Sequence, residues 1–227
     1  ASGWLATNRS GQRWEAPCVV VAAGTGSRQL AALEWLPLQA IRGQTTQLPS
    51  NKLFSQLHAV LCHEGYIAPP RQGMHCIGAT FDLDDSDPTP RPGAHRSNLD
   101  SLASAVPAWQ AILQREDAAA LSGRVGFRCA SPDYLPLAGP VPDRQAFLHH
   151  FGGLRSNARK AIPRRGRYVP GLFLSTGHGS RGLSSTPLIA ELLASQICGE
   201  LPPLSRELIR ALAPGRFIIR DLCRNRI

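Results

Sequence analysis

The feature that most constrains the fold is a strand, a glycine loop and a helix near the end of the chain. The apolar run Leu172–Ser175 leads into Gly177–Gly182, which has the form G-x-G-x-x-G, and a helical pattern continues to Gly199. Such glycines let the backbone approach a flat or anionic ligand, and the helix directs free N–H groups and its positive dipole end toward it. A complete dinucleotide site needs a second strand with an acidic residue, but residues 201–203 read Leu-Pro-Pro. We therefore predict a cofactor-contacting loop rather than a complete nucleotide site.

A similar segment lies near the start of the chain. Residues 4–15 have the pattern of a hairpin, and Cys18–Ala23 is a continuous apolar run, as expected of a strand buried on both faces. Gly24-Thr25-Gly26-Ser27 breaks this run, and we predict a helix through Gln29–Leu33. Alone, the segment fits any buried strand that ends in a tight turn. Beside the C-terminal loop, it predicts the other wall of a nucleotide crevice.

The middle of the chain has a different character. Short β runs at 41–48, 59–62, 65–68 and 75–79 are separated by glycine and proline. Residues 82–96 are acidic and then proline-rich, which predicts a loop, and residues 97–113 predict a helix that Pro107 kinks or divides. This pattern indicates an antiparallel-sheet domain.

Past the middle, residues 131–140 are too rich in proline and glycine to predict regular structure, and residues 154–168 predict a basic loop or irregular helix. The last helix is predicted to start with Thr186 as N-cap and Pro187 at its first position, and Gly199 ends it. Its expected core face consists of Leu188, Leu192 and Ile197.

These patterns predict an α/β fold, α+β overall, in which one Rossmann-like layer is interrupted by a long antiparallel β insertion. We expect three segments. Residues 1–37 form the end of the first stretch of the Rossmann-like domain, residues 38–128 form the inserted sheet domain, and residues 129–227 return to the Rossmann-like domain.

Positive charge is concentrated in the last third of the chain. The net charge is +9, and residues 1–154 carry twelve basic and twelve acidic side chains, whereas residues 155–227 carry thirteen and four. One stretch holds six cations without an acid: Arg155, Arg159, Lys160, Arg164, Arg165 and Arg167. Contact with phosphates is the natural physical use of such a cluster, and the alternative is a solvated surface loop without a function.

The remaining composition argues against a metal site, a membrane span and a catalytic histidine. The six cysteines show neither a C-x-x-C pair nor zinc spacing, so reduced and mostly buried thiols are expected, and no metal site is predicted. No apolar run reaches the length of a membrane span, which predicts a soluble, cytoplasmic protein without a membrane partner. His178 lacks a second ligand nearby in sequence, so we expect a structural rather than a metal-binding or catalytic histidine.

Three further residues are candidates for binding or catalysis. Arg128 follows an apolar strand and precedes a proline-rich turn, where an unpaired charge is unfavourable. It would either pair with Asp133 or clamp a substrate carboxylate through two parallel hydrogen bonds. Arg181, inside the glycine loop, allows the same two interpretations, and Tyr66 allows plain sheet packing as well as a functional role.

Six motifs in order resemble the D-amino-acid oxidase and glycine oxidase family of flavoproteins across nearly the whole chain. They are Val-Val-Val-Ala-Ala-Gly at 19–24, Arg-Gly-Gln at 42–44, Gly-Tyr-Ile-Ala-Pro at 65–69, Ile-Gly-Ala-Thr at 77–80, Gly-Phe-Arg at 126–128 with Asp-Tyr-Leu-Pro-Leu-Ala-Gly at 133–139, and Gly-His-Gly-Ser-Arg-Gly-Leu at 177–183. The strongest likeness is to the oxidoreductase domains of bifunctional enzymes that modify tRNA, because the glycine loop, Leu201-Pro202-Pro203-Leu204 and the ending 212–217 resemble those domains.

The resemblance implies a partial FAD-binding layer with the inserted sheet forming a roof over the flavin. The residues implied to contact FAD are Ala23, Gly24, Gly26, Gly177, His178, Gly179, Ser180, Arg181, Gly182 and Leu183. Arg128, with Tyr66 and Arg181, matches the positions that hold the substrate carboxylate. The implied reaction moves a hydride from the carbon between amine and carboxylate to FAD, and water then hydrolyses the imine.

For the tRNA-modifying branch, the resemblance implies removal of the carboxymethyl group from 5-carboxymethylaminomethyl uridine, with or without a 2-thio group, at the wobble position. The products would be aminomethyl uridine and glyoxylate. The basic cluster would face the anticodon arm, and a separate N-terminal methyltransferase domain would use S-adenosylmethionine. Because no counterpart of the family's first βαβ unit is found, we expect the chain to be the C-terminal part of a longer protein, with weak FAD retention. A small-molecule glycine or D-amino-acid oxidase and an inactive fragment are the alternatives.

Overall fold

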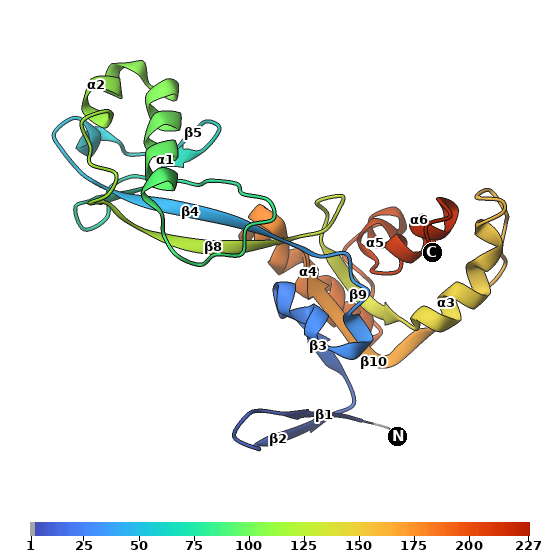
Figure 1. The fold of residues 1–227 in the computed structure, drawn as a ribbon. Helices are drawn as coiled ribbons and strands as arrows, with labels where there is room; N and C mark the ends of the chain where they lie inside the picture. The colour runs from blue at the N-terminus through green and yellow to red at the C-terminus, as the bar shows by residue number, and fades with distance from the viewer. Residues whose placement is uncertain (1–2) are drawn as a thin grey trace. The chain divides into compact units, whose positions relative to one another are not determined.

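The structure, a computed structural model, describes residues 3–227, which fall into two compact units (Figure 1). Unit 1 combines the chain up to Gln39 with Cys129–Ile227, and unit 2 is Ala40–Arg128. Within residues 3–227 the strands form three sheets: a two-stranded hairpin, a three-stranded sheet and a five-stranded sheet. Mixed helices and sheets agree with the predicted α+β class.

The chain begins with the predicted hairpin. β1 (Trp4–Thr7) pairs antiparallel with β2 (Arg13–Ala16). Trp4 also donates a hydrogen bond from Nε1 to the carbonyl of Pro170, at 3.0 Å. This bond ties the hairpin to a strand more than 160 residues later in the sequence.

The three-stranded sheet of unit 1 joins both ends of the sequence. β10 (Tyr168–Thr176) lies in the middle, parallel to β3 (Val19–Val21) and antiparallel to β9 (Leu137–Pro142). Because β3 and β10 are parallel, the loops that follow them leave the sheet at the same edge.

Two expectations for this sheet were wrong. The first strand is not buried on both faces: β3 is an edge strand among the described residues, and Val20 is 40% exposed. Residues 131–140 are not wholly irregular, because β9 begins at Leu137. An edge strand tolerates Pro140 and Pro142, since a missing N–H can lie on its unpaired side.

The helices of unit 1 also differ from the prediction. The turn after β3 is itself a 3₁₀ helix, Gly24–Gln29, followed by a second at Ala31–Leu33, in place of one α-helix. The later α-helices of unit 1 are α3 (Arg144–Phe151), α4 (Gly182–Cys198), α5 (Arg206–Leu212) and α6 (Arg216–Cys223). The basic residues 155–167 form the predicted loop between α3 and β10.

The helix α4 starts earlier than its capping signal suggests. It begins at Gly182, so Thr186 and Pro187 lie inside it, and Thr186 Oγ1 donates back to the Gly182 carbonyl at 2.6 Å. The predicted core face was wrong for two positions: Leu188 is 45% and Ile197 38% exposed, whereas Leu192 is buried together with Ile189, Leu193 and Ser195. Gly199 ends the helix with a φ of 74°, as predicted.

Unit 2 is built on the five-stranded sheet, in the order β5-β6-β7-β4-β8. Its strands are β4 (Gln39–Pro49), β5 (Leu61–Cys62), β6 (Tyr66–Ile67), β7 (Met74–Gly78) and β8 (Ser122–Ala130). These strands confirm the predicted short β runs. The sheet carries helices on one face, α1 (Pro92–Ala105) and α2 (Gln110–Leu113), separated by a 3₁₀ turn at Pro107–Trp109 (Figure 1).

The core of unit 2 fills the space between the sheet and α1. Leu48, Ile67 and Ile77 from the strands pack against Leu99 and Leu102 of α1, and all five are fully buried. Because side chains alternate along a strand, the neighbours of the sheet residues point to the opposite face. The predicted loop at 82–96 was too long, because α1 begins at Pro92, a residue suited to the first helical turn.

Other structural findings bear on function. No helix within residues 3–227 is long and apolar enough to cross a membrane. The described residues hold no group of three or more His, Cys, Asp or Glu side chains suited to a metal ion. The six cysteines are free thiols, but none is fully buried, and Cys62 and Cys198 are exposed, so the expectation of mostly buried thiols was wrong.

Candidate active site

The glycine loop of unit 1 turns sharply between β10 and α4. Gly177 has a φ of +72°, in the left-handed region that favours glycine, and a Cβ there would lie 3.0 Å from Leu137 Cδ1. Gly179, with a φ of +56°, has open space where a Cβ would project. A 3₁₀ turn over Gly179–Arg181 then leads directly into the first turn of α4. The loop therefore presents open backbone followed by the N-terminus of a 17-residue helix.

The loop after β3 lies beside this glycine loop. Thr176, at the end of β10, donates a hydrogen bond from Oγ1 to the carbonyl of Gly24 at 3.0 Å. Gly24 has a φ of +55°. The structure thus brings together two sets of predicted cofactor residues: Ala23, Gly24 and Gly26 on one side, and the segment Gly177–Leu183 on the other.

His178 holds the glycine loop to the helix that follows. Its Nε2 lies 3.1 Å from Ser175 Oγ and its Nδ1 lies 2.8 Å from Ser185 Oγ. Burial lowers the pKa of His178, so the ring is neutral at pH 7. One ring nitrogen is engaged by the end of β10 and the other by the first turn of α4, which supports the structural role expected for this residue. Sequence reasoning missed Ser175 and Ser185, because hydroxyls at these spacings carry no motif.

The two loops fit one wall of an FAD site. Ligands of open α/β sheets bind outside the carboxyl ends of the strands, where the loops after β3 and β10 lie. The hydroxyl of Ser27, in the first loop, is buried and has no hydrogen-bond partner among residues 3–227. A flat, anionic cofactor can be contacted by exposed backbone N–H groups, by a helix N-terminus and by a hydroxyl without another partner. The two loops supply all three.

A second group of candidate residues lies on the sheet of unit 2. Tyr66 pairs with Gly78, so it faces away from α1 together with Cys76, two residues earlier in β7. The Tyr66 hydroxyl lies 3.6 Å from Cys76 Sγ. Burial, and next the hydrogen bond with Cys76, raise the pKa of Tyr66 to about 12, although the charge of Arg128 acts in the opposite direction. Tyr66 therefore keeps its proton at neutral pH, and its hydroxyl can donate a hydrogen bond to a carboxylate.

Arg128 lies near Tyr66 and is held by three neighbours. Its Nη1 donates to the carbonyl of Thr80 at 3.1 Å, and its Cζ lies 5.5 Å from the centre of the Phe81 ring. Its guanidinium also lies against Gly43, where a Cβ would be 2.8 Å from Cζ. The half-buried Arg128 side chain is thus oriented by the Thr80 carbonyl and the Phe81 ring, and the absence of a side chain at Gly43 leaves room for its guanidinium.

The alternative partner suggested for Arg128 is engaged elsewhere. Asp133 forms an ion pair with Arg216, at 2.9 Å between Oδ1 and Nη2. Burial would raise the pKa of Asp133, but the hydrogen bonds from Arg216 and Ser131 outweigh it and lower the pKa to about 2. The suggested Arg128–Asp133 ion pair was therefore wrong.

Sequence reasoning missed the residues that support Arg128. Gly43, Thr80 and Phe81 contact it, and Cys76 contacts Tyr66. The motif Arg42-Gly43-Gln44 was a signal for Gly43, because glycine within a strand often marks a close approach. Arg181, the third predicted carboxylate contact, is exposed in the glycine loop of unit 1.

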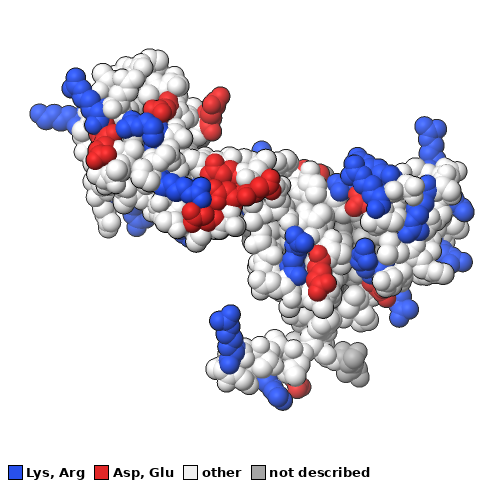
Figure 2. Space-filling view, in the orientation of Figure 1, with Lys and Arg blue, Asp and Glu red and all other residues white. Residues whose placement is uncertain are grey.

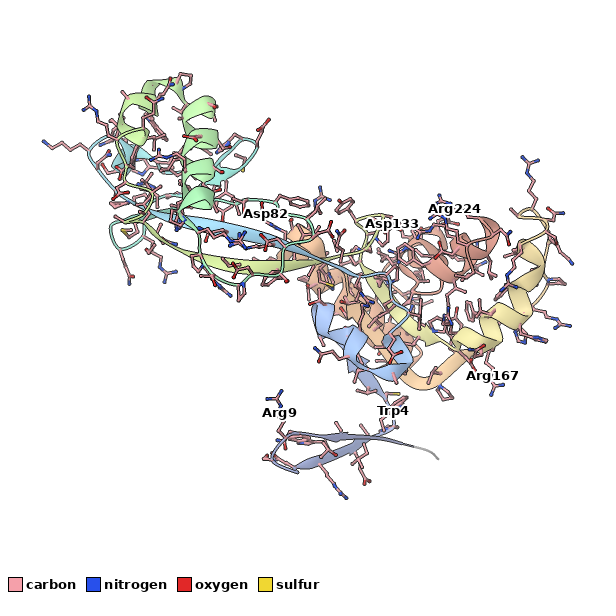
Figure 3. All side chains as sticks on the ribbon, in the orientation of Figure 1. Trp4, Arg9, Asp82, Asp133, Arg167 and Arg224 are labelled. Atoms are coloured by element: carbon pink, nitrogen blue, oxygen red, sulfur yellow. The ribbon has the colours of Figure 1, made fainter. Side chains whose placement is uncertain are left out.

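The six residues of the basic cluster, at positions 155–167, are all exposed. Arg155 donates from Nε to the carbonyl of Ile227 at 2.6 Å, which ties the loop to the chain end. Arg167 lies 3.9 Å from Asp143 and remains 75% exposed. Figure 2 shows blue side chains gathered over the part of unit 1 that contains α3 and α6, and Figure 3 labels Arg167 and Arg224 there. The described cluster therefore presents its charge to solvent.

Comparisons with known proteins agree on one family. The family described as FAD dependent oxidoreductase matches residues 1–196. A tRNA 5-methylaminomethyl-2-thiouridine biosynthesis bifunctional protein from Saccharophagus degradans is 42% identical over 225 residues, covering 99% of this chain and 31% of the relative. The protein of the same name from Pseudomonas aeruginosa is 44% identical, covering 92% of the chain and 32% of the relative. The chain thus spans about a third of the length of these curated relatives.

Solved structures show the same fold at lower identity. Glycine oxidase from Geobacillus kaustophilus superimposes with a TM-score of 0.66 at 20% identity, over 95% of this chain and 50% of the oxidase. Iminodiacetate oxidase from Chelativorans sp. BNC1 gives a TM-score of 0.62 at 21% identity, over 94% and 52%. These similarities establish the fold.

Proposed function

The chain belongs to the family of FAD-dependent oxidoreductases, and from this premise we propose that it serves to oxidise a glycine-like arm on the wobble uridine of tRNA. The substrate is 5-carboxymethylaminomethyl uridine, with or without a 2-thio group. The curated relatives, whose name describes biosynthesis of a 5-methylaminomethyl-2-thiouridine, support this choice. The observation that carries the proposal is the placement of Arg128 and Tyr66 on one face of the unit 2 sheet, where the charge of Arg128 acts on the Tyr66 hydroxyl.

Arg128 and Tyr66 would bind the substrate carboxylate. The guanidinium supplies fixed positive charge and a fork of N–H donors that matches a carboxylate. The Tyr66 hydroxyl adds a neutral donor, because its pKa of about 12 keeps it protonated. Arg181 is the third proposed contact. Arg128 and Tyr66 would fix the carbon between the amine and the carboxylate in one orientation.

Two segments would hold the cofactor: Gly177–Leu183 and Ala23–Gly26. His178 would fix the shape of the glycine loop, Gly177–Gly182. FAD, when bound there, supplies the acceptor for a hydride from that carbon. Loss of the hydride and of the amine proton leaves an imine on the substrate. Water adds to the imine carbon and the C–N bond breaks, which releases glyoxylate and leaves aminomethyl uridine.

The basic cluster at 155–167 would contact the phosphates of the anticodon arm. Its exposure and its lack of acids support this role. We further propose that the whole protein includes a methyltransferase domain, because the curated relatives are called bifunctional and are about three times as long as the match.

The test uses the full-length gene product loaded with FAD and tRNA that bears carboxymethylaminomethyl uridine. Glyoxylate release with a matching loss of the carboxymethyl mass from the nucleoside is expected. Arg128→Met should lower kcat/KM by at least about 100-fold, because methionine cannot donate charge-assisted hydrogen bonds that orient the carboxylate. Arg124→Met, on the same strand but exposed, is the matched control and should retain activity.

A small-molecule amine or glycine oxidase is the alternative, and the fold shared with glycine oxidase favours it. Rapid consumption of free glycine or sarcosine, without release of glyoxylate from tRNA, would select this alternative. Absence of both activities in the FAD-loaded protein would indicate an inactive fragment.

A further inference from the structure

A buried arginine with an acidic partner lies on the sheet face opposite to Arg128. The Arg42 side chain is 1% exposed, and its Nη1 lies 3.2 Å from Asp82 Oδ2. Its other hydrogen bonds reach the carbonyls of Asp87, at 2.8 Å, and Thr89, at 2.7 Å, and the side-chain oxygen of Gln44 at 3.1 Å. A buried guanidinium is costly unless it is paired and hydrogen-bonded, and here all three nitrogens donate at least one hydrogen bond.

The ion pair fixes the segment that follows β7. Asp82 Oδ2 accepts a second hydrogen bond from Thr80 Oγ1 at 2.8 Å, and the same hydroxyl accepts from the Gln44 N–H at 3.0 Å. The backbone of Arg42 exchanges hydrogen bonds with Asp82 at 2.9 and 3.0 Å. Figure 3 labels Asp82 beside β4 of the unit 2 sheet. Thr80 and Asp82 therefore have fixed positions relative to β4.

The same segment supplies two of the three contacts of Arg128. The Thr80 carbonyl accepts from its Nη1, and the ring of Phe81 lies beneath its guanidinium. The third contact, Gly43, is the neighbour of Arg42 in β4. The residues that contact Arg128 thus lie in β4, next to Arg42, and in the segment that Asp82 fixes to β4.

We propose that the Arg42–Asp82 ion pair is a positioning pair for Arg128, because it fixes the Thr80–Phe81 segment that orients the Arg128 guanidinium. The consequence for carboxylate binding rests on the proposed function. The consequence for the conformation of Arg128 does not, so the two can be tested separately.

The first experiment observes Arg128 in the full chain labelled with ¹⁵N-arginine. Its guanidinium N–H signals are assigned by their loss in Arg128→Lys. In Asp82→Asn, we expect these signals to move toward those of free arginine and to exchange with water about tenfold faster, because the Thr80 carbonyl loses its fixed position. Asp84→Asn is the control, since Asp84 is an exposed carboxylate of the same loop and should leave the signals unchanged.

A second pair of variants tests the same proposal if Asp82→Asn does not fold. Thr80→Val removes the hydroxyl that links Asp82 to Gln44 and keeps nearly the same shape, so it should shift the Arg128 signals in the same direction. Thr80→Ser retains the hydroxyl and should restore them. Arg128 signals that stay unchanged in Thr80→Val, and in Asp82→Asn where it folds, would overturn the proposal.

The second experiment measures binding to the FAD-loaded full-length gene product. The probes are the nucleosides 5-carboxymethylaminomethyluridine and 5-aminomethyluridine, which differ in the carboxymethyl group. Asp82→Asn should weaken binding of the first about tenfold and leave the second unchanged, a loss specific to the carboxylate. If the wild type does not prefer the first probe, the proposed function fails, and the Arg128 signals still decide the positioning role.

Discussion

Gly43 shows how one missing side chain shapes the candidate site, because the guanidinium of Arg128 occupies the space beside it. We predict that Gly43→Ala displaces Arg128 and weakens carboxylate binding about tenfold. The free energy of unfolding should change by less than about 1 kcal/mol, since a flexible side chain can move aside and alanine suits a strand better than glycine. Binding of the two nucleoside probes and urea unfolding measure both effects.

Gly126→Ala is the matched control for this prediction. Gly126 lies in β8, and a Cβ there would meet no atom within 4 Å. It should leave both binding and stability near their wild-type values. Loss of stability without loss of carboxylate binding in Gly43→Ala would contradict the assigned contact.

At the residue scale, sequence reasoning selected Tyr66 and Arg128, which the fold brings together. It did not select Thr80, Phe81 or Cys76. Their contacts depend on strand pairing across the sheet, and a single sequence does not reveal the register of strands separated by long loops. The roles of Tyr66, Arg128 and Arg181 stay predictions.

At the element scale, the glycine loop and α4 form a unit that should respond to pH through His178. Burial lowers its pKa from the ordinary value of 6.5, so the folded chain binds a proton less readily than the unfolded chain. The stabilisation is complete above pH 6.5 and is lost as pH falls toward the lower folded pKa. We predict that unfolding at pH 5.5 requires less urea than at pH 7.5, because protonation of the His178 ring lowers the free energy of unfolding.

The variant His178→Gln should reduce this pH dependence, since glutamine does not titrate. The exposed His58→Gln serves as the control for the loss of an imidazole outside the glycine loop. Equal pH dependence in wild type and His178→Gln would show that the loop histidine does not titrate in this range. Burial also lowers the pKa of His95. Its contribution to the pH dependence of stability is the same in both variants.

Element boundaries show where local patterns fail. Gly199 was predicted as the end of α4 because its left-handed conformation is a local requirement. The start of α4 was misplaced by five residues, because packing of the glycine loop overrides the capping signal of Thr186 and Pro187. The strand β9 was missed because pairing with β10 outweighs the low strand propensity of its prolines.

At the scale of the whole molecule, the uneven charge predicts a salt-dependent interaction with RNA. Replacing all six residues of the basic cluster with glutamine should weaken tRNA binding at least about tenfold at low salt. It should also reduce the slope of log Kobs against log salt by about 0.7 to 0.9 for each phosphate that the protein no longer neutralises. Filter binding at salt concentrations from about 50 to about 200 mM measures both quantities.

The control for the charge prediction replaces Arg9, Arg13, Arg96, Arg115, Arg124 and Arg144 with glutamine, six exposed or partly exposed cations outside the cluster. This variant has the same net charge as the first. If both weaken tRNA binding equally, the total charge rather than the cluster attracts RNA. A larger loss for the cluster variant would support a defined binding surface.

The last prediction concerns how much of the cofactor these 227 residues can hold. The G-x-G-x-x-G form occurs once, at the loop before α4, and the described residues supply the walls after β3 and β10. The chain should therefore contact the flavin portion and make few contacts with the adenosine diphosphate portion. We predict binding weaker than about 10 µM for both FAD and FMN, with affinities within about threefold of each other.

Equilibrium dialysis of the purified chain against each flavin tests this prediction. Gly177→Val should abolish the remaining affinity, because a side chain there is strained at a φ of +72° and collides with Leu137. Gly11→Val, at a positive φ in the β1–β2 turn, carries a similar strain in unit 1 but lies outside both cofactor loops, so it should retain flavin binding. Tight, stoichiometric retention of FAD over FMN would instead mean that the described residues also bind the diphosphate, and the second glycine loop at Gly24–Gly26 would then be its most suitable site.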